Sequence, residues 1–187
     1  MNVHEAVSTN IAVRDFKDEP VSEEHLLKIL DAGRLCQSGK NLQPWYFIVI
    51  RQRQLLDALA DLMKGDIDEE RTRKAPVAIA IVSDPLSEFH VVDAARAAQN
   101  MTLVAWELGV GSAFISGPEP PEREPYRMKA KKILQIPENL NFIDLIIFGY
   151  PKHWRIIKKK NRKQLQDIVF EEKFGNRLNM GKADTHL

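Results

Sequence analysis

The sequence predicts a mixed fold in which helices cover a β-sheet. Four apolar runs have the length and composition of strands: 45–50, 76–84, 111–117 and 141–151. The first of them is apolar or aromatic throughout, which predicts burial on both faces. Between the runs lie segments whose apolar residues recur at the i, i+3, i+4 spacing of an amphipathic helix. Strands interleaved with helices are typical of α/β and α+β proteins, and the residues alone leave both classes open.

Local signals give each predicted helix its position. Residues 22–35 begin with Ser22 as the N-cap, early acids follow, and apolar residues then fall on one face. Helical spacing recurs in four further segments: 52–63, 90–108, 126–135 and 163–174. Many inward residues of 90–108 are small, so we expect another helix to approach this one closely. The proline-rich segment 118–125 is predicted to be a surface loop.

Composition limits the classes of protein to which the chain can belong. No internal repeat or Gly/Ser-rich linker divides its 187 residues, so we expect a single domain over 1–187. Its formal net charge of +1 gives no general attraction to nucleic acid or membranes. The single cysteine, Cys36, cannot form an internal disulfide, and no Cys/His cluster suggests zinc. With no secretory signal and no apolar run of about 20 residues, a cytoplasmic protein is expected.

The most basic part of the sequence is KHWRIIKKKNRK at 152–163, which holds seven Lys or Arg residues. Three interpretations stay open: a solvated surface, a phosphate site, or a nucleic-acid surface in which Trp154 stacks on bases. Arg14 lies in an apolar context near the N-terminus, and either pairs with a surface acid or binds a ligand. The turn-forming residues Ser38 to Asn41 either link a helix to a strand or contact a ligand.

No familiar catalytic motif is present. The sequence lacks the GxSxG elbow and the HExxH zinc motif, and its five histidines share no spacing. Cys36 has no adjacent base and is interpreted as a core thiol at a helix end. Asp93 is a formal candidate for a general base, but an acid on a helix is more often structural. If the protein is an enzyme, a bound cofactor is expected to perform the chemistry.

A series of segments in a fixed order carries a family resemblance: NIAVRDF, VSEEHLLKILDAG, QSGKNLQPW, QNMTLVAWELGVG, GYP and KNRKQLQDIV. Together they resemble the nitroreductase family of FMN flavoproteins over nearly the whole chain. The resemblance implies an α+β fold with a central, mostly antiparallel sheet flanked by helices. It also implies an intertwined homodimer with two FMN sites at the interface, where the small residues of 90–108 would suit a close helix contact. The basic segment and C-terminal helix, 152–187, would belong to the same FMN-binding domain.

The resemblance also assigns residues to the flavin. Its phosphate would be held by Arg14, Lys160 and Arg162, with Asn10 and Ala12 standing where the family usually has Arg and Ser. Losing that arginine removes a charge-assisted hydrogen bond worth roughly 1.5–3 kcal/mol. Ring contacts would come from the loop Ser38 to Asn41 of the neighbouring subunit and from Arg71, Phe114, Ile115, Ser116 and Gly117. The last four would lie near N5 of the ring, and the arginine near its pyrimidine end.

The implied activity is a ping-pong oxidoreduction. NAD(P)H delivers a hydride to flavin N5 and departs, and a nitroaromatic, quinone or similar acceptor then enters the same pocket. No side chain is needed as a catalytic acid or base, and segment 118–126 is expected to gate the pocket. Two alternatives stay open: a flavoprotein with another acceptor, in reductive dehalogenation or oxygen-dependent chemistry, and a non-catalytic flavin or nucleic-acid binding protein. The leading interpretation has a second copy and small molecules as partners, without nucleic acid or membrane.

Overall fold

The computed structural model describes residues 1–115, 122–154 and 160–179. The chain separates into two compact units, Met1–Ile156 and Ile157–Leu187. The single domain predicted over the whole chain stays a prediction. Among the described helices, none has both the length and the apolar composition needed to cross a membrane.

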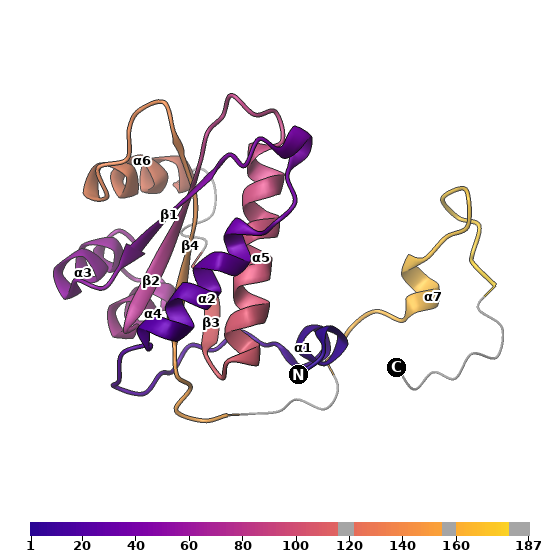
Figure 1. The fold of residues 1–187 in the computed structure, drawn as a ribbon, viewed down its shortest axis with the longest axis horizontal. Helices are drawn as coiled ribbons and strands as arrows, with labels where there is room; N and C mark the ends of the chain where they lie inside the picture. Colours follow the sequence, from indigo (N-terminus) through magenta and orange to yellow (C-terminus); the bar gives the residue numbers. More distant parts are fainter. Residues whose placement is uncertain (116–121, 155–159, 180–187) are drawn as a thin grey trace. The chain divides into compact units, whose positions relative to one another are not determined.

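A four-stranded sheet forms the centre of the first unit (Figure 1). Its strands are β1 (Trp45–Ile50), β2 (Val77–Ser83), β3 (Gly111–Ile115) and β4 (Asn141–Gly149). They lie in the order β1-β2-β4-β3, and every neighbouring pair is antiparallel. The four predicted strands are therefore confirmed, although Ser116 and Gly117 of the third run lie outside the described residues. The antiparallel sheet with its flanking helices also confirms the α+β class.

Helices cover both faces of this sheet (Figure 1). One face carries α2 (Glu23–Arg34) and α5 (His90–Glu107), and the other carries α3 (Arg53–Asp61) and α6 (Arg123–Ile133). Two shorter helices complete the described part of this unit: α4 (Ile67–Lys74), which packs against α3, and α1 (Val3–Thr9), which contacts α5. Helices α2, α3, α5 and α6 begin and end within three residues of the predicted bounds, so those four predictions are confirmed.

The central strand β2 explains why its sequence is apolar without interruption. Successive side chains of a strand point to opposite faces. Val77, Ile79 and Ile81 join the core under α2 and α5, whereas their neighbours join the core under α3 and α6. Every residue of β2 is buried, because both faces of the strand are covered by helices.

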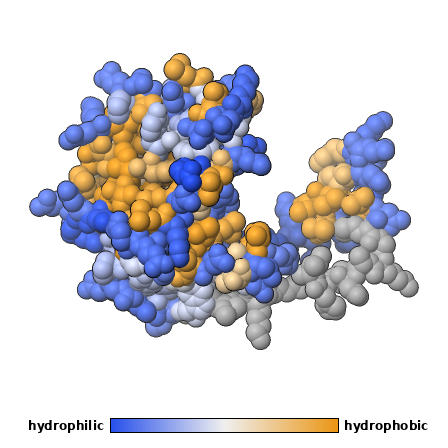
Figure 2. Space-filling model, in the orientation of Figure 1, coloured by the Kyte–Doolittle hydropathy of each residue, from blue (hydrophilic) through white to orange (hydrophobic). Residues whose placement is uncertain are grey.

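Strand β1 departs from the prediction of burial on both faces. It is an edge strand whose second residue, Tyr46, is 53% exposed and whose next three residues are half-buried, although Trp45 and Ile50 at its ends are buried. Figure 2 shows hydrophobic residues at the surface over the region where Figure 1 draws β1 and β2. The run is apolar, but its place at the edge of the sheet leaves its middle partly uncovered.

The close helix contact predicted for 90–108 is confirmed, but its partner is a helix of the same chain. Helix α5 packs on α2 through Ala94, Ala98, Met101 and Ala105. A Cβ atom added at Gly33 of α2 would lie 2.8 Å from the sulfur of Met101, which shows how closely the helices approach. The small residues are therefore used within the subunit, and assigning them to a contact between subunits was wrong.

Helices α1 and α4 have no counterpart among the predictions. Helix α1 begins with a capping box, in which the Glu5 N–H donates to Asn2 Oδ1 (2.9 Å) and the Asn2 N–H donates to the Glu5 carboxylate (3.0 Å). Helix α4 is almost wholly polar and carries i,i+4 ion pairs such as Lys74 with Glu70 (2.6 Å). The spacing of apolar residues does not reveal such a helix, because α4 buries little more than Thr72.

The predicted helix 163–174 is wrong beyond its first turn. Among the described residues 160–179 the one helix is α7 (Leu165–Ile168), and the positive φ of 59° at Glu172 interrupts any continuation as a helix. The loop predicted over 118–125 is also shortened at its end, because α6 begins at Arg123. Its residues 118–121 lie outside the described part of the chain.

Candidate functional site

The N-terminal motif lies along strand β3. The Val13 N–H donates to the Ser112 carbonyl (2.9 Å), and Ala12 forms a parallel bridge with the same serine. A Cβ atom at Gly111 would lie 2.6 Å from Cβ of Val13, so only glycine allows the two segments to come this close. The structure therefore brings Asn10, Ala12 and Arg14 to the strand that also carries Phe114 and Ile115, two of the predicted ring contacts.

Not all of the predicted residues on these segments present a side chain to a ligand. Arg14 and Ala12 are exposed, and Phe114 is 39% exposed on β3. Ile115 is completely buried in the core beneath α3 and α6, so only its backbone is available to a cofactor. Arg14 and Phe114 thus offer a cation and an aromatic face on adjacent segments.

The loop at Ser38 to Asn41 has an unusual backbone. It contains a single 3₁₀ turn, η1 (Gly39–Asn41); φ is positive at Lys40 (52°) and Asn41 (56°), and again just after the loop at Gln43 (50°). Non-glycine residues in this region cost about 1–3 kcal/mol each and persist only where the surroundings determine them. Ser38 Oγ accepts a hydrogen bond from the Gln43 N–H (3.0 Å), which ties the two ends of the loop together.

Asp93, in the first turn of α5, holds this loop from beneath. Its side chain is completely buried, and its Oδ2 accepts a hydrogen bond from the Gly39 N–H (3.0 Å). Its other oxygen accepts from Arg96 (3.2 Å). Both carboxylate oxygens therefore have a donor, as a structural acid requires, and the general-base interpretation finds no support here. Phe89 packs under Gly39, where a Cβ atom would lie 2.6 Å from the ring.

Cys36 follows α2 and is half-buried. Its thiol donates to the Gln37 carbonyl (3.4 Å). Burial raises the pKa of the Cys36 thiol, and the charge of Asp93 raises it further against the opposing effect of Arg96. The group is therefore a protonated thiol near neutral pH, in agreement with its interpretation as structural.

Helix α5 separates the N-terminal motif from the loop within one chain. Its N-terminal end holds the loop through Asp93, whereas its C-terminal end holds α1, where Trp106 Nε1 donates to Thr9 Oγ1 (2.8 Å). A helix of 18 residues is about 27 Å long. Figure 1 shows α1 and the loop after α2 at opposite ends of α5. The two predicted parts of the site are therefore far apart in a single subunit.

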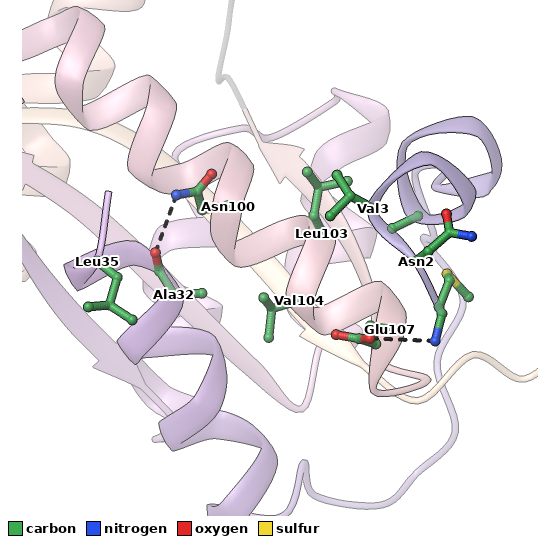
Figure 3. A pocket seen from close by; sticks show the side chains of 10 residues that line it. Asn2, Val3, Ala32, Leu35, Asn100, Leu103, Val104 and Glu107 are labelled. Carbon is green, nitrogen blue, oxygen red and sulfur yellow. Dashed lines mark hydrogen bonds and ion pairs between the residues drawn. The ribbon is translucent and has the colours of Figure 1, made fainter. Parts of the chain in front are cut away.

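An apolar cavity of about 360 Å³ lies at the α1 end of α5 (Figure 3). It is lined by α1, α2 and α5, with Val3, Leu35, Leu103 and Val104 among its apolar residues. Glu107 closes one side through an ion pair with the N-terminal amino group (3.5 Å). None of the predicted site residues lines this cavity.

Arg71 lies on α4, which belongs to the opposite face of the sheet from α5. Its guanidinium forms an ion pair with Asp68 (2.7 Å), and the two side chains are 22% and 21% exposed. The charge of Arg71 is therefore already balanced by a neighbouring carboxylate. The structure does not bring Arg71 together with the loop that Asp93 holds.

Two ionisable residues where α6 packs on β4, half-buried Asp144 and buried Tyr126, were missed by sequence reasoning. Burial raises the pKa of Asp144, in β4, to about 6, although a hydrogen bond from the Leu145 N–H (2.9 Å) opposes this shift. Tyr126 of α6 is also buried, and burial followed by the charge of Asp144 raises its pKa. Its hydroxyl has no hydrogen-bond partner among the described residues. The single acid within the apolar run NFIDLIIFG was the available signal.

The basic segment begins with contacts inside the first unit. Trp154 stacks on Trp106 with ring centroids 4.4 Å apart, and Lys152 pairs with Asp15 (3.1 Å). One face of Trp154 is therefore already covered, which weakens the nucleic-acid interpretation. Lys160 and Arg162 lie in the second unit, where burial and then the charge of Arg162 lower the pKa of Lys160.

Comparison with known proteins identifies the family. The model of the nitroreductase family matches residues 11–75 and 66–150 of the chain. The protein belongs to the nitroreductase family. A relative from Archaeoglobus fulgidus, provisionally assigned as an NADH dehydrogenase/NAD(P)H nitroreductase, is 33% identical over 174 residues. The match covers 90% of this chain and 96% of that protein.

Solved structures agree with the family assignment. An FMN-dependent nitroreductase from Clostridium difficile has a TM-score of 0.81 and 27% identity, and the match covers 91% of this chain and 99% of that one. A protein from Parabacteroides distasonis, provisionally assigned as an NADH dehydrogenase/NAD(P)H nitroreductase, has a TM-score of 0.82 and 25% identity. That match covers 93% of this chain and all of the other. The nitroreductase fold implied by the resemblance is thus confirmed.

We expect Asp144 to make stability depend on pH. Because folding raises its pKa from 3.8 to about 6, the folded state holds the proton more tightly than the unfolded state. The contribution of Asp144 is therefore most favourable below about pH 4, and it is lost as the pH rises through 6. Relative to wild type, Asp144→Asn should gain up to about 3 kcal/mol in unfolding free energy between pH 4 and pH 8.

Urea unfolding across this pH range measures the difference directly. Asp144→Asn keeps an oxygen that can accept the Leu145 N–H, so it tests the charge rather than the hydrogen bond. Asp18→Asn, at an exposed position, serves as the control. A pH-independent difference between Asp144→Asn and wild type would contradict the prediction.

Proposed function

We propose that the protein is an FMN-dependent oxidoreductase that takes electrons from NADH or NADPH and reduces a nitroaromatic, a quinone or a similar small acceptor. The observation that carries the proposal is the junction of residues 10–14 with β3, which sets exposed Arg14 beside the strand of Phe114. Family membership and the likeness to the C. difficile FMN-dependent nitroreductase support it. When bound, FMN supplies a ring that accepts a hydride from one partner and passes electrons to the next.

The donor set fits a flavin mononucleotide. The phosphate is a dianion, and cations with several N–H donors are its usual partners in proteins. We assign this role to Arg14, Lys160 and Arg162, with the Asn10 side chain and the Ala12 backbone as neutral donors. The absence of an arginine at position 10 removes one charge from this set. The remaining three cations still exceed the charge of a phosphate dianion.

We assign the ring to a second group of residues. Phe114 offers an apolar face, Ile115 its backbone, and the loop Ser38 to Asn41 offers polar groups to the ring edge. The predicted contacts at Ser116 and Gly117 are kept as part of this proposal. Arg71 could act at the pyrimidine end only by exchanging its pairing with Asp68 for one with the ligand. These residues bind and orient the ring, and none of them needs to transfer a proton.

We infer that the active form is a homodimer with two shared sites. The loop is held at the N-terminal end of α5, and the N-terminal motif follows α1, which is held at the C-terminal end. A helix of 18 residues is about 27 Å long, which exceeds the length of one flavin mononucleotide. A second copy can supply the loop to the motif of the first. Apolar side chains remain exposed around the same helix, including Val3 (78%), Val91 (51%) and Val92 (50%). A partner subunit that covered them would remove this surface from water.

Purification tests the proposed function most directly. The protein should carry, or take up, one FMN per chain and show the visible absorbance of a flavin. Anaerobic addition of NADH or NADPH should bleach that absorbance, and a nitroaromatic or quinone should then restore it. A colourless protein that FMN cannot reconstitute would overturn the proposal.

Arg14→Ala should separate phosphate binding from ring binding. Losing a charge-assisted hydrogen bond to the phosphate should raise the Kd for FMN by roughly 10–100-fold. Riboflavin lacks the phosphate, so its Kd should change by less than about twofold, the typical error of such comparisons. Titration of the cofactor-free protein by flavin fluorescence gives both constants. The control is Arg34→Ala, at an exposed position of α2, and equal losses for the two flavins would refute the assignment of Arg14.

Mixed dimers test whether the sites are shared. Lys40→Pro breaks the loop, because proline cannot adopt φ of 52°, whereas the matched variant Lys40→Gly keeps that conformation available. Arg14→Glu damages the phosphate side. Each variant alone should lose FMN, but a dimer with one chain of each kind should regain one intact site. Stoichiometry of FMN in doubly tagged dimers measures this, and a mixed dimer without FMN would place both parts in one chain.

A further inference from the structure

We propose that Asp93 is a positioning residue that sets the shape of the loop from Ser38 to Asn41 for contact with a bound flavin. Asp93 touches no cofactor in this proposal, and it acts through the backbone of Gly39. The inference rests on the proposed function, because the contact with flavin is what gives the shape of the loop a use.

The contact between Asp93 and the loop is partly buried and charge-assisted. A buried carboxylate is costly unless donors satisfy it. Asp93 is 0% exposed and has two donors: the Gly39 N–H at 3.0 Å and Arg96 at 3.2 Å. Arg96 is 60% exposed, so solvent screens its ion pair. The hydrogen bond to Gly39 is therefore the better shielded of the two and belongs to the stronger class.

The other hydrogen bonds of the loop are local. The Asn41 N–H donates to the Ser38 carbonyl (3.1 Å), and the Gln43 N–H donates to Ser38 Oγ (3.0 Å). These bonds curl the loop on itself without attaching it to the rest of the protein. The ion pair between Lys40 and Glu88 (3.6 Å) does cross to the neighbouring segment, but both side chains are about 70% exposed and such pairs are weak.

The strained backbone explains why the loop needs an anchor. Three residues with positive φ raise the free energy of this conformation relative to relaxed alternatives. The bond from Asp93 to Gly39 stabilises the strained form, and Phe89 fills the space beneath the same glycine. Because Asp93 belongs to the first turn of α5, its hydrogen bond to Gly39 fixes the position of the loop relative to this helix.

Exchange of the loop amides in cofactor-free protein tests the anchor without any flavin. In Asp93→Ala we expect the Gly39 amide to exchange at least tenfold faster than in wild type, measured by NMR. Asp93→Asn retains an oxygen that can accept the Gly39 N–H, so it should restore most of the protection. Asp31→Ala, at an exposed position of α2, is the control, and thermal unfolding establishes that each variant is folded. Unchanged exchange at Gly39 in folded Asp93→Ala would overturn the proposal.

Flavin binding tests the consequence for the site. Because the loop is assigned to the ring, Asp93→Ala should weaken FMN and riboflavin alike, by about tenfold or more. This pattern differs from that of Arg14→Ala, which should affect FMN alone, and Asp93→Asn should recover most of the affinity. Wild-type affinity for both flavins in Asp93→Ala would refute the positioning role. If wild-type protein binds no flavin, the proposed function fails, whereas the exchange experiment still decides whether Asp93 anchors the loop.

Discussion

The packing of α5 against α2 and the sheet is the constraint on which the rest of the structure depends. Gly33 lets α2 approach Met101 closely, and other buried positions of α5 in the same core, Ala94, Ala98 and Ala105, carry only small side chains. A helix packed in this way is a rigid spacer, because protein cores resist even small changes in volume. The loop after α2 and the N-terminal motif are attached to its two ends, so its length decides their separation.

That separation has a consequence for how a site can be built. In the proposed function, each part alone offers only half of what a flavin needs: Arg14 for its phosphate near one end of α5, and the polar groups of the loop for its ring at the other. In the homodimer that we propose, a second copy would bring complementary ends together. The exposed apolar residues of α1 and α5, and the uncovered edge strand β1, are surfaces that such an arrangement could bury.

Buried Asp93 and half-buried Asp144 show that removal from water alone does not define the role of an acid. Asp93 has a donor for each oxygen and serves the geometry of a loop. Asp144 accepts a hydrogen bond from Leu145, and burial still raises its pKa to about 6. It therefore carries a cost at neutral pH that Asp93 largely avoids through its partners. Neither difference is visible in the residue type, since both positions are occupied by aspartate.

The sequence by itself determined the strands, the long helices and the family, because these depend on local periodicity and on motifs of neighbouring residues. It failed where local pattern is weak, as in polar α4, or misleading, as at 163–174, where apolar spacing does not produce a long helix. Only the tertiary structure decided that Gly39 meets Asp93, 54 residues away, and that Thr9 meets Trp106, 97 residues away. Such contacts depend on how helices and strands pack in space, and no local period records that packing.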